Sequence, residues 1–197
     1  MKVVTAPNQY EPKHGEISVF LAGGITNCWD WQKAVIEELA KFDGTDQLVV
    51  YNPRRDNFPI GDPNAAQEQI EWEFKYLHKA DIFSMYFTAG DSDQPICMYE
   101  LGVHTTRSLK TDTPFCVVVS VEDGYRRAQD VNIQMQLAFK CDIVNVHANA
   151  KSHAFLIYKD YLMQREMQYF LIRTTFHDGS AFCTSRKTCS IMSLVQP

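Results

Sequence analysis

Short apolar runs alternate with amphipathic segments along most of the chain, and this alternation limits the folds that it can adopt. Five runs are apolar and rich in β-branched or aromatic residues, at 17–22, 48–51, 81–87, 115–120 and 143–146. Five segments carry apolar residues at helical spacing, at 29–41, 65–80, 97–109, 124–139 and 150–173. Strands that alternate with helices form parallel sheets covered on both faces. The sequence therefore predicts an α/β fold, a doubly wound five-stranded parallel sheet of flavodoxin-like (Rossmann-like) topology with a C-terminal helical extension.

The two ends of the chain differ from this pattern. Residues 1–16 are polar and contain two prolines, which predicts an irregular lead-in. We expect the α/β domain to span 17–148, a size typical of one domain, and a C-terminal helix and tail to occupy 149–197. From residue 148 on, Lys and Arg outnumber Asp and Glu by 6 to 3. The tail after Phe176 is expected to wrap over the surface or to be partly disordered, and an oligomer contact is the alternative.

Composition disfavours several classes of protein. No apolar run reaches the ~18 residues of a membrane span, and no signal peptide is recognised, so we expect a cytoplasmic protein that contacts no membrane. The net charge of −5 argues against a broad surface for nucleic acid. The six cysteines and six histidines are scattered, which predicts reduced thiols and no metal site. No cofactor is expected either.

Ligands of doubly wound sheets bind beyond the carboxyl ends of the strands. In this chain the rule selects four loops, at 22–28, 52–64, 87–96 and 120–132. Gly23 and Gly24 in the first loop would let the backbone approach a ligand closely, although glycine also ends strands routinely. The loop lacks the complete G-x-G-x-x-G pattern and the lysine of a P-loop, so it does not by itself identify a ligand. Asn27 is expected to cap the helix that follows.

Glu100 is the first candidate for chemistry at this edge of the sheet. Because the next helix is predicted to begin near Cys97, Glu100 is expected within about one turn of its N-terminus. The helix dipole stabilises an ionised carboxylate there by roughly 0.3–1 kcal/mol. Such a carboxylate can act as a nucleophile or stabilise an oxocarbenium-like centre. An ordinary first-turn glutamate is the alternative.

Five short motifs extend this interpretation. They are F-L-A-G-G-I-T at 20–26, N-P-R-R at 52–55, Q-I-E-W-E at 69–73, A-D-I at 80–82 and Y-E-L-G at 99–102. In this order and spacing they resemble the nucleoside 2-deoxyribosyltransferase superfamily, in particular a branch with the N-P-R-R, W-E and Y-E-L-G motifs. The resemblance covers about residues 17–146 and leaves the lead-in and the tail outside.

The resemblance implies roles for two glutamates. Glu100 matches the nucleophile that attacks the anomeric carbon of a deoxynucleoside and displaces the base. Glu73, which lies eight residues before Asp81, matches an acidic residue that donates a proton to the departing base, although relatives usually have Asp there. The two carboxyl groups would need different pKa values. The helix terminus would lower that of Glu100, and burial beside Trp72 would raise that of Glu73.

Further positions follow from the same resemblance. Phe20 stands where relatives often have Tyr, Gly23 and Gly24 match the backbone turn beside the sugar, and Asn132 loosely matches an asparagine given across a subunit interface. The candidate substrate-binding residues are Phe20, Gly23, Gly24, Asn52, Arg54, Trp72, Asp93, Gln94 and Asn132. A place in the core is the alternative for Trp72, and a solvated turn is the alternative for Arg54.

The residue six positions before Glu100 bears on the choice of substrate. The transferases have Asp there, which holds the sugar hydroxyls. Related deoxynucleoside-monophosphate N-glycosidases have Ser followed by Leu-Gly and bind a 5′-phosphate. This chain has Gln94, preceded by Asp91 and Asp93, so an uncharged nucleoside is expected. Three arginines of other loops offer contacts for a phosphate instead: Arg54, Arg55 and Arg126.

The sequence leaves three functions open. The first is a nucleoside 2-deoxyribosyltransferase-like enzyme that moves the sugar of a 2′-deoxynucleoside to another base through a covalent glycosyl-glutamate intermediate. The second is a nucleoside or nucleoside-monophosphate N-glycosidase, in which water replaces the second base. The third is a non-catalytic nucleotide-binding module, which would not require the pair Glu73 and Glu100. The expected partners are a deoxynucleoside, a free nucleobase and further copies of the chain, in a homodimer or larger homo-oligomer.

Overall fold

The computed structural model describes residues 1–110 and 115–177. Its strands and α-helices, in chain order, are β1 (Lys2–Thr5), β2 (Ile17–Gly23), α1 (Trp31–Leu39), β3 (Leu48–Asn52), α2 (Ala65–Lys79), β4 (Ile82–Phe87), α3 (Pro95–Lys110), β5 (Cys116–Glu122), α4 (Ala128–Phe139), β6 (Val144–Ala148) and α5 (Ala150–His177). A short 3-10 helix, Thr45–Gln47, precedes β3. The tail predicted after Phe176 lies outside the described residues from position 178 on.

The strands form one parallel sheet in the order β1-β3-β2-β4-β5-β6. Five of them, from β3 to β6, have the flavodoxin-like order, which confirms the predicted fold class. The strand count was wrong, because Lys2–Thr5 is not irregular but pairs with β3 at the edge of the sheet. This strand has only four residues and Pro7 follows it closely, so it carries little of the periodicity that reveals longer strands.

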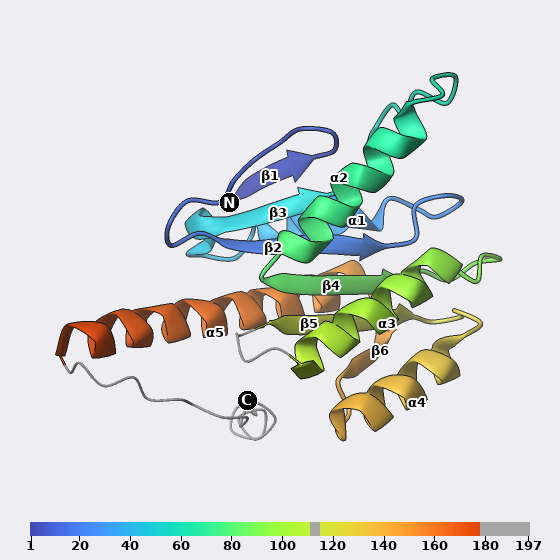
Figure 1. Ribbon diagram of the computed structural model, residues 1–197. Helices are drawn as coiled ribbons and strands as arrows, with labels where there is room; N and C mark the ends of the chain where they lie inside the picture. The colour runs from blue at the N-terminus through green and yellow to red at the C-terminus, as the bar shows by residue number, and fades with distance from the viewer. Residues whose placement is uncertain (111–114, 178–197) are drawn as a thin grey trace.

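Two helical layers cover the sheet (Figure 1). Helices α2, α3 and α4 lie on one face, over a core that includes Phe20, Trp72 and Met135. Helices α1 and α5 lie on the other face, over a core that includes Trp31 and Tyr161. The chain winds from β2 to β3 in one direction and from β4 to β6 in the other. A crevice therefore forms between the carboxyl ends of β2 and β4, where the direction changes.

The central strands are buried on both faces. All residues of β4, and those of β2 up to Ala22, are buried, which explains why both strands read as continuous apolar runs. Asp81, directly before β4, accepts hydrogen bonds from the backbone amide and the hydroxyl of Ser18, at 2.8 and 2.7 Å. These bonds join the amino-terminal ends of β2 and β4, at the end of the strands away from the crevice.

Two helices begin at positions that differ from the prediction. Asp30 caps α1, since its side chain accepts a hydrogen bond from a backbone amide of the first turn. Asn27, the expected cap, has a left-handed φ of 59° in the preceding loop. Helix α3 begins at Pro95 rather than near Cys97. Proline suits this place because its φ is already helical and it lacks the N–H that a first turn leaves unpaired. The earlier start places Glu100 in the second turn of α3.

Two findings bear on the expectations from composition. Within the described residues, no helix is both long and apolar enough to cross a membrane. Cys28, Cys97, Cys116 and Cys141 are present as thiols. The other two cysteines, Cys183 and Cys189, lie outside the part of the chain that the structure describes.

A buried histidine joins α5 to two central strands. His153 is fully buried, and its ring nitrogens lie 2.7 Å from the hydroxyl oxygens of Ser84 in β4 and Ser120 in β5. A neutral imidazole has one donor and one acceptor nitrogen, and each can pair with a hydroxyl. Burial lowers the pKa of His153 to about 3. The protein thus contains a neutral His153 at physiological pH.

We expect this histidine to weaken the fold in acid. Its pKa in the unfolded chain is about 6.5, so below that pH the unfolded chain takes up a proton that the folded chain resists until about pH 3. The free energy of unfolding therefore falls as pH falls, by at most about 1.4 kcal/mol per pH unit from this group. Denaturant titrations between about pH 4 and pH 7 measure the slope. His153→Gln should flatten it, and an unchanged slope would contradict this account.

Candidate active site

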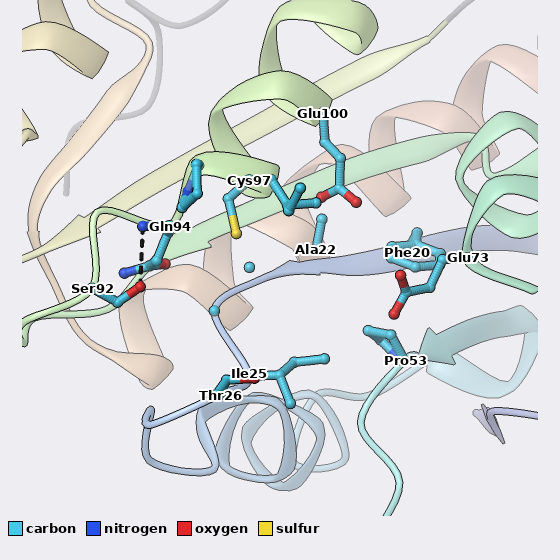
Figure 2. A pocket seen from close by; sticks show the side chains of 14 residues that line it. Phe20, Ala22, Ile25, Thr26, Pro53, Glu73, Ser92, Gln94, Cys97 and Glu100 are labelled. Carbon is cyan, nitrogen blue, oxygen red and sulfur yellow. Dashed lines mark hydrogen bonds between the residues drawn. The ribbon is translucent and has the colours of Figure 1, made fainter. Parts of the chain in front are cut away.

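A cleft of about 280 Å³ opens at the carboxyl ends of β2 and β4. Its walls come from β2, from the loops after β2, β3 and β4, and from α2 and α3 (Figure 2). The residues that line it are Phe20, Ala22, Gly23, Gly24, Ile25, Thr26, Pro53, Glu73, Ser92, Gln94, Pro95, Ile96, Cys97 and Glu100. Three of the four loops selected from the sequence thus reach the cleft, and the loop at 120–132 does not.

Two carboxyl groups turn into this cleft from different helices (Figure 2). Glu73 comes from α2 and lies beside Phe20 and Pro53 (Figure 2). Its Oε1 accepts a hydrogen bond of 2.8 Å from Gln69, one turn earlier in the helix. Glu100 comes from the second turn of α3. Both side chains are half-buried, so they are partly shielded from water while they face the same space.

Burial raises the pKa of both carboxyl groups. Loss of hydration is the main cause for each, and the negative charge of Glu73 adds to the rise for Glu100, whose pKa reaches about 8. The hydrogen bond from Gln69 and the charge of Arg55 act in the opposite direction on the pKa of Glu73. The pair therefore binds a proton at neutral pH. The prediction that a helix terminus would lower the pKa of Glu100 was wrong in sign, because loss of hydration outweighs the helix dipole, which is weak beyond the first turn.

Gly23 lets the chain turn sharply at the end of β2. It pairs with Tyr86 of β4 and has a φ of 152°, which residues with a side chain rarely adopt. A Cβ there would lie 2.3 Å from the Tyr86 carbonyl oxygen and 2.6 Å from the ring of Trp31. The ring nitrogen of Trp31 also donates to the carbonyl oxygen of Gly24, at 2.9 Å. Only glycine therefore fits at position 23, where the backbone forms part of the cleft.

Gln94 lies at the end of the cleft away from Glu73 (Figure 2). It is 5% exposed, and its Nε2 donates to the carbonyl oxygen of Thr88 at 2.8 Å and to the Thr88 hydroxyl at 3.2 Å. Its Oε1 is buried and has no hydrogen-bond partner among the described residues. A Cβ on Gly24 would lie 2.7 Å from this oxygen. The wall of the cleft thus contains a buried, uncharged acceptor whose direction is fixed by Thr88.

A comparison with known proteins identifies the family of this chain. The family described as nucleoside 2-deoxyribosyltransferase like matches residues 16–125, more than half of the chain. The chain belongs to this family. No curated protein matches the sequence. The match confirms the resemblance based on motifs, but it ends before α4, earlier than the expected limit near residue 146.

Two residues of the N-P-R-R motif form hydrogen bonds near the loop after β2. The guanidinium group of Arg54 donates to the carbonyl oxygens of Cys28 and Trp29, at 2.8 and 2.9 Å. The side chain of Asn52 accepts a hydrogen bond of 3.0 Å from the backbone amide of Arg54. Neither residue lines the cleft. They connect the end of β3 to the loop after β2 instead of facing the space where a ligand would lie.

The other two arginines considered for phosphate also have partners. Arg55 forms an ion pair of 2.8 Å with Glu68, and its side chain is 8% exposed. Arg126 pairs with Asp91 at 3.2 Å and lies 3.7 Å from Asp93. None of these residues lines the cleft, and the two acidic side chains of the loop after β4 face Arg126 rather than the ligand space.

Trp72 and Asn132 also lie away from the cleft. Trp72 is 2% exposed, its ring centroid lies 5.9 Å from that of Phe20, and its ring nitrogen donates to the carbonyl oxygen of Asn8. Successive residues of a helix point about 100° apart, so Trp72 faces the core while Glu73 faces the cleft. Asn132 belongs to α4, which contributes no lining residue.

Sequence reasoning missed several residues that line the cleft: Ala22, Ile25, Thr26, Pro53, Ser92, Pro95, Ile96 and Cys97. All lie at strand ends or in the loops and first helical turn that follow. The rule about carboxyl ends selected their loops, but their small or apolar side chains carry no chemical signature. Burial raises the pKa of the Cys97 thiol to about 12, so it is neutral and not a nucleophile at physiological pH.

Proposed function

We propose that this protein cleaves the N-glycosidic bond of 2′-deoxynucleosides and transfers the sugar to another base through a covalent intermediate on Glu100. The observation that carries the proposal is the pair Glu73 and Glu100, turned into one cleft from two helices. Cleaving such a bond requires stabilisation of positive charge at the anomeric carbon and a proton for the departing base. The pair holds one proton at neutral pH, and it meets both requirements in the form in which Glu73 carries that proton and Glu100 is ionised.

The reaction consists of two displacements at the anomeric carbon. In the first, a carboxylate oxygen of Glu100 bonds to C1′, the C1′–N bond breaks, and the proton of Glu73 passes to the base nitrogen. In the second, a nitrogen of the acceptor base bonds to C1′, the ester bond to Glu100 breaks, and Glu73 takes up the proton that the acceptor loses. Each displacement inverts C1′, so the product retains the configuration of the substrate.

The charge of the cleft favours an uncharged nucleoside. Its described lining residues include two carboxylic acids and no Lys, Arg or His. A 5′-phosphate would add negative charge to this space without a cation to pair with it. The pairing of the three nearby arginines with other groups supports the same choice of substrate.

The two ends of the cleft differ in a way that supports one orientation of the nucleoside. At one end, Oε1 of Gln94 lacks a partner, and a buried acceptor without a donor costs free energy until a ligand supplies one. A sugar hydroxyl is such a donor. At the other end, Phe20 and Pro53 provide apolar surface beside Glu73, where a flat base would receive its proton. The sugar therefore lies toward Gln94 and the base toward Glu73.

The proposal includes a homodimer or a larger homo-oligomer. Large apolar side chains are exposed on the three helices that cover one face of the sheet (Figure 1), namely Ile70, Phe74, Ile96, Tyr99, Ile133 and Leu137. Exposed apolar surface of this kind is typical of an interface between chains. Ile96 also lines the cleft, so a second copy on this face would lie next to it.

The deciding experiment is incubation with deoxyinosine or thymidine, with and without a free acceptor base, followed by chromatography of the products. We expect base exchange that depends on the acceptor, and no turnover of deoxynucleoside monophosphates. Free deoxyribose formed at the same rate with or without the acceptor would instead identify an N-glycosidase. Binding of nucleosides without turnover, unchanged in Glu100→Ala, would identify a non-catalytic module.

A further inference from the structure

Gln69 lies between Glu73 and the loop that follows β3. Its Nε2 is 2.7 Å from the carbonyl oxygen of Pro53 and 2.8 Å from Oε1 of Glu73. Gln69 and Glu73 are four residues apart in α2, so their side chains lie on the same side of the helix. Gln69 does not line the cleft, whereas Glu73 does. The amide group of Gln69 therefore hydrogen-bonds to the carboxyl group of Glu73 without contacting the ligand space.

Pro53 determines which way the Gln69 amide group faces. A backbone carbonyl oxygen can only accept hydrogen bonds, so the part of the amide next to it is the NH₂ group. This group has two hydrogens, and its nitrogen lies within hydrogen-bond distance of two oxygens, one from Pro53 and one from Glu73. Oε1 of Glu73 is thus an acceptor in this arrangement, both when the carboxyl group is ionised and when it is protonated.

We propose that Gln69 is a positioning residue that keeps Oε1 of Glu73 as an acceptor, so that Oε2 carries the proton exchanged with the base. A protonated carboxyl group has one hydroxyl oxygen, and a hydrogen on Oε1 would compete with the amide hydrogen of Gln69. The inference rests on the proposed function, in which Glu73 is the proton donor. It adds a residue that acts through Glu73 and not on the substrate.

The charged groups that face Glu73 come from two other elements. Arg55, in the loop after β3, lowers the pKa of Glu73 and is itself paired with Glu68. Glu100 faces it from α3. Burial raises the pKa of Glu73, and the Gln69 hydrogen bond opposes that rise. A group that donates a proton in one step and takes one back in the next works best with a pKa near the working pH.

Helix α2 also contains a matched control for this interaction. Nε2 of Gln67 donates to Oε1 of Glu71 at 2.7 Å, with the same spacing of four residues and on an exposed side of the helix. Gln67→Met and Gln69→Met therefore remove the same type of bond from the same helix. Methionine has a similar length to glutamine and no donor, so it occupies the space without forming the bond.

The test compares kcat and kcat/KM of the two variants with those of the wild type across pH, with a deoxynucleoside and an acceptor base. Gln69→Met should lower kcat about tenfold with little change in KM, the effect of one lost bond to a charged group. The alkaline limb of its pH profile should move up by about one pH unit, because the ionised form of Glu73 has lost a donor. Gln67→Met should match the wild type.

A double variant separates positioning of Glu73 from a general structural role. In a Glu73→Gln background, Gln69→Met should cause no further loss of kcat, because the group that it positions is already absent. An equal further loss there, or an unshifted pH profile in Gln69→Met alone, would overturn the inference while leaving the proposed function intact. Absence of cleavage by the wild type, with any nucleoside, would instead overturn the proposed function itself.

Discussion

Glu100→Gln is expected to lower kcat for nucleoside cleavage by about 10⁴-fold or more. The amide is close in size to the carboxylate, so the shape of the cleft should change little. Its oxygen is a far weaker nucleophile, and it cannot form a stable ester with C1′. Chromatography of the released base, at saturating nucleoside, measures the loss. A variant that keeps more than about a tenth of the wild-type kcat would contradict the role of Glu100 as nucleophile.

The stability of the same variant serves as the control for folding. The pKa of Glu100 is about 8 in the folded protein and about 4.5 in an unfolded chain. Between these values the folded state binds a proton that the unfolded state has released, so this group lowers stability as pH rises. Glu100→Gln should lack that decrease and be at least as stable as the wild type at about pH 8. Loss of both activity and stability would indicate misfolding instead.

Glu73→Gln should lower kcat by about 10²–10⁴-fold for natural nucleosides, the usual contribution of a general acid. The effect should depend on the leaving group, because an amide cannot supply the proton that a poor leaving group needs. A deoxyribosyl substrate with an electron-poor leaving group, which departs without a proton, should be cleaved by the variant at nearly the wild-type rate. Rates for the two substrates, measured side by side, give the ratio that tests this role.

Glu71→Gln is the matched control for this second prediction. Glu71 belongs to the same helix, is exposed and does not line the cleft. Its replacement should leave both rates unchanged. Equal losses on both substrates in Glu73→Gln would contradict the assignment of Glu73 as proton donor, and would assign it a part in binding the sugar.

The order of strands and helices was predictable because most strands of this sheet are buried and continuous in sequence. Residues 17–22 and 82–87 are almost entirely apolar and are buried on both faces, a pattern typical of strands in a covered parallel sheet. Strand β1 escaped prediction for the opposite reason. It lies at the edge, has two exposed residues, and is stabilised by its pairing with β3, which no local pattern records.

Glu100 was predictable from its place at the carboxyl ends of the strands, and the resemblance to the family paired it with Glu73. The pKa of Glu100 was not predictable. The helix dipole contributes about 0.3–1 kcal/mol, less than one pKa unit, whereas the pKa of Glu100 rises from about 4.5 to about 8. Desolvation therefore outweighs the dipole, and its extent depends on how α2 and α3 pack, which the sequence does not contain.

The remaining differences between the predicted and the observed site arise from the directions in which side chains point. Trp72 and Glu73 are neighbours in the W-E motif, and the rotation of α2 decides which of them faces the cleft. Arg54 could not be assigned from sequence because its partners, the carbonyl oxygens of Cys28 and Trp29, belong to a loop that is distant in the chain. Gln94 was predictable from its place six residues before Glu100. That its Oε1 lacks a partner is visible only in the structure, where its Nε2 donates to Thr88.

The central claim is that a sugar becomes bonded to Glu100 during turnover. A 2′-deoxy-2′-fluoro nucleoside slows both displacements because the fluorine destabilises positive charge at C1′, and the second should be slow enough for the intermediate to accumulate. Mass spectrometry of the intact protein should show the addition of one fluorinated sugar, and digestion should place it on the peptide that contains Glu100. Glu100→Gln should show no addition. Turnover of deoxynucleosides without an adduct, or an adduct on another residue, would contradict the account.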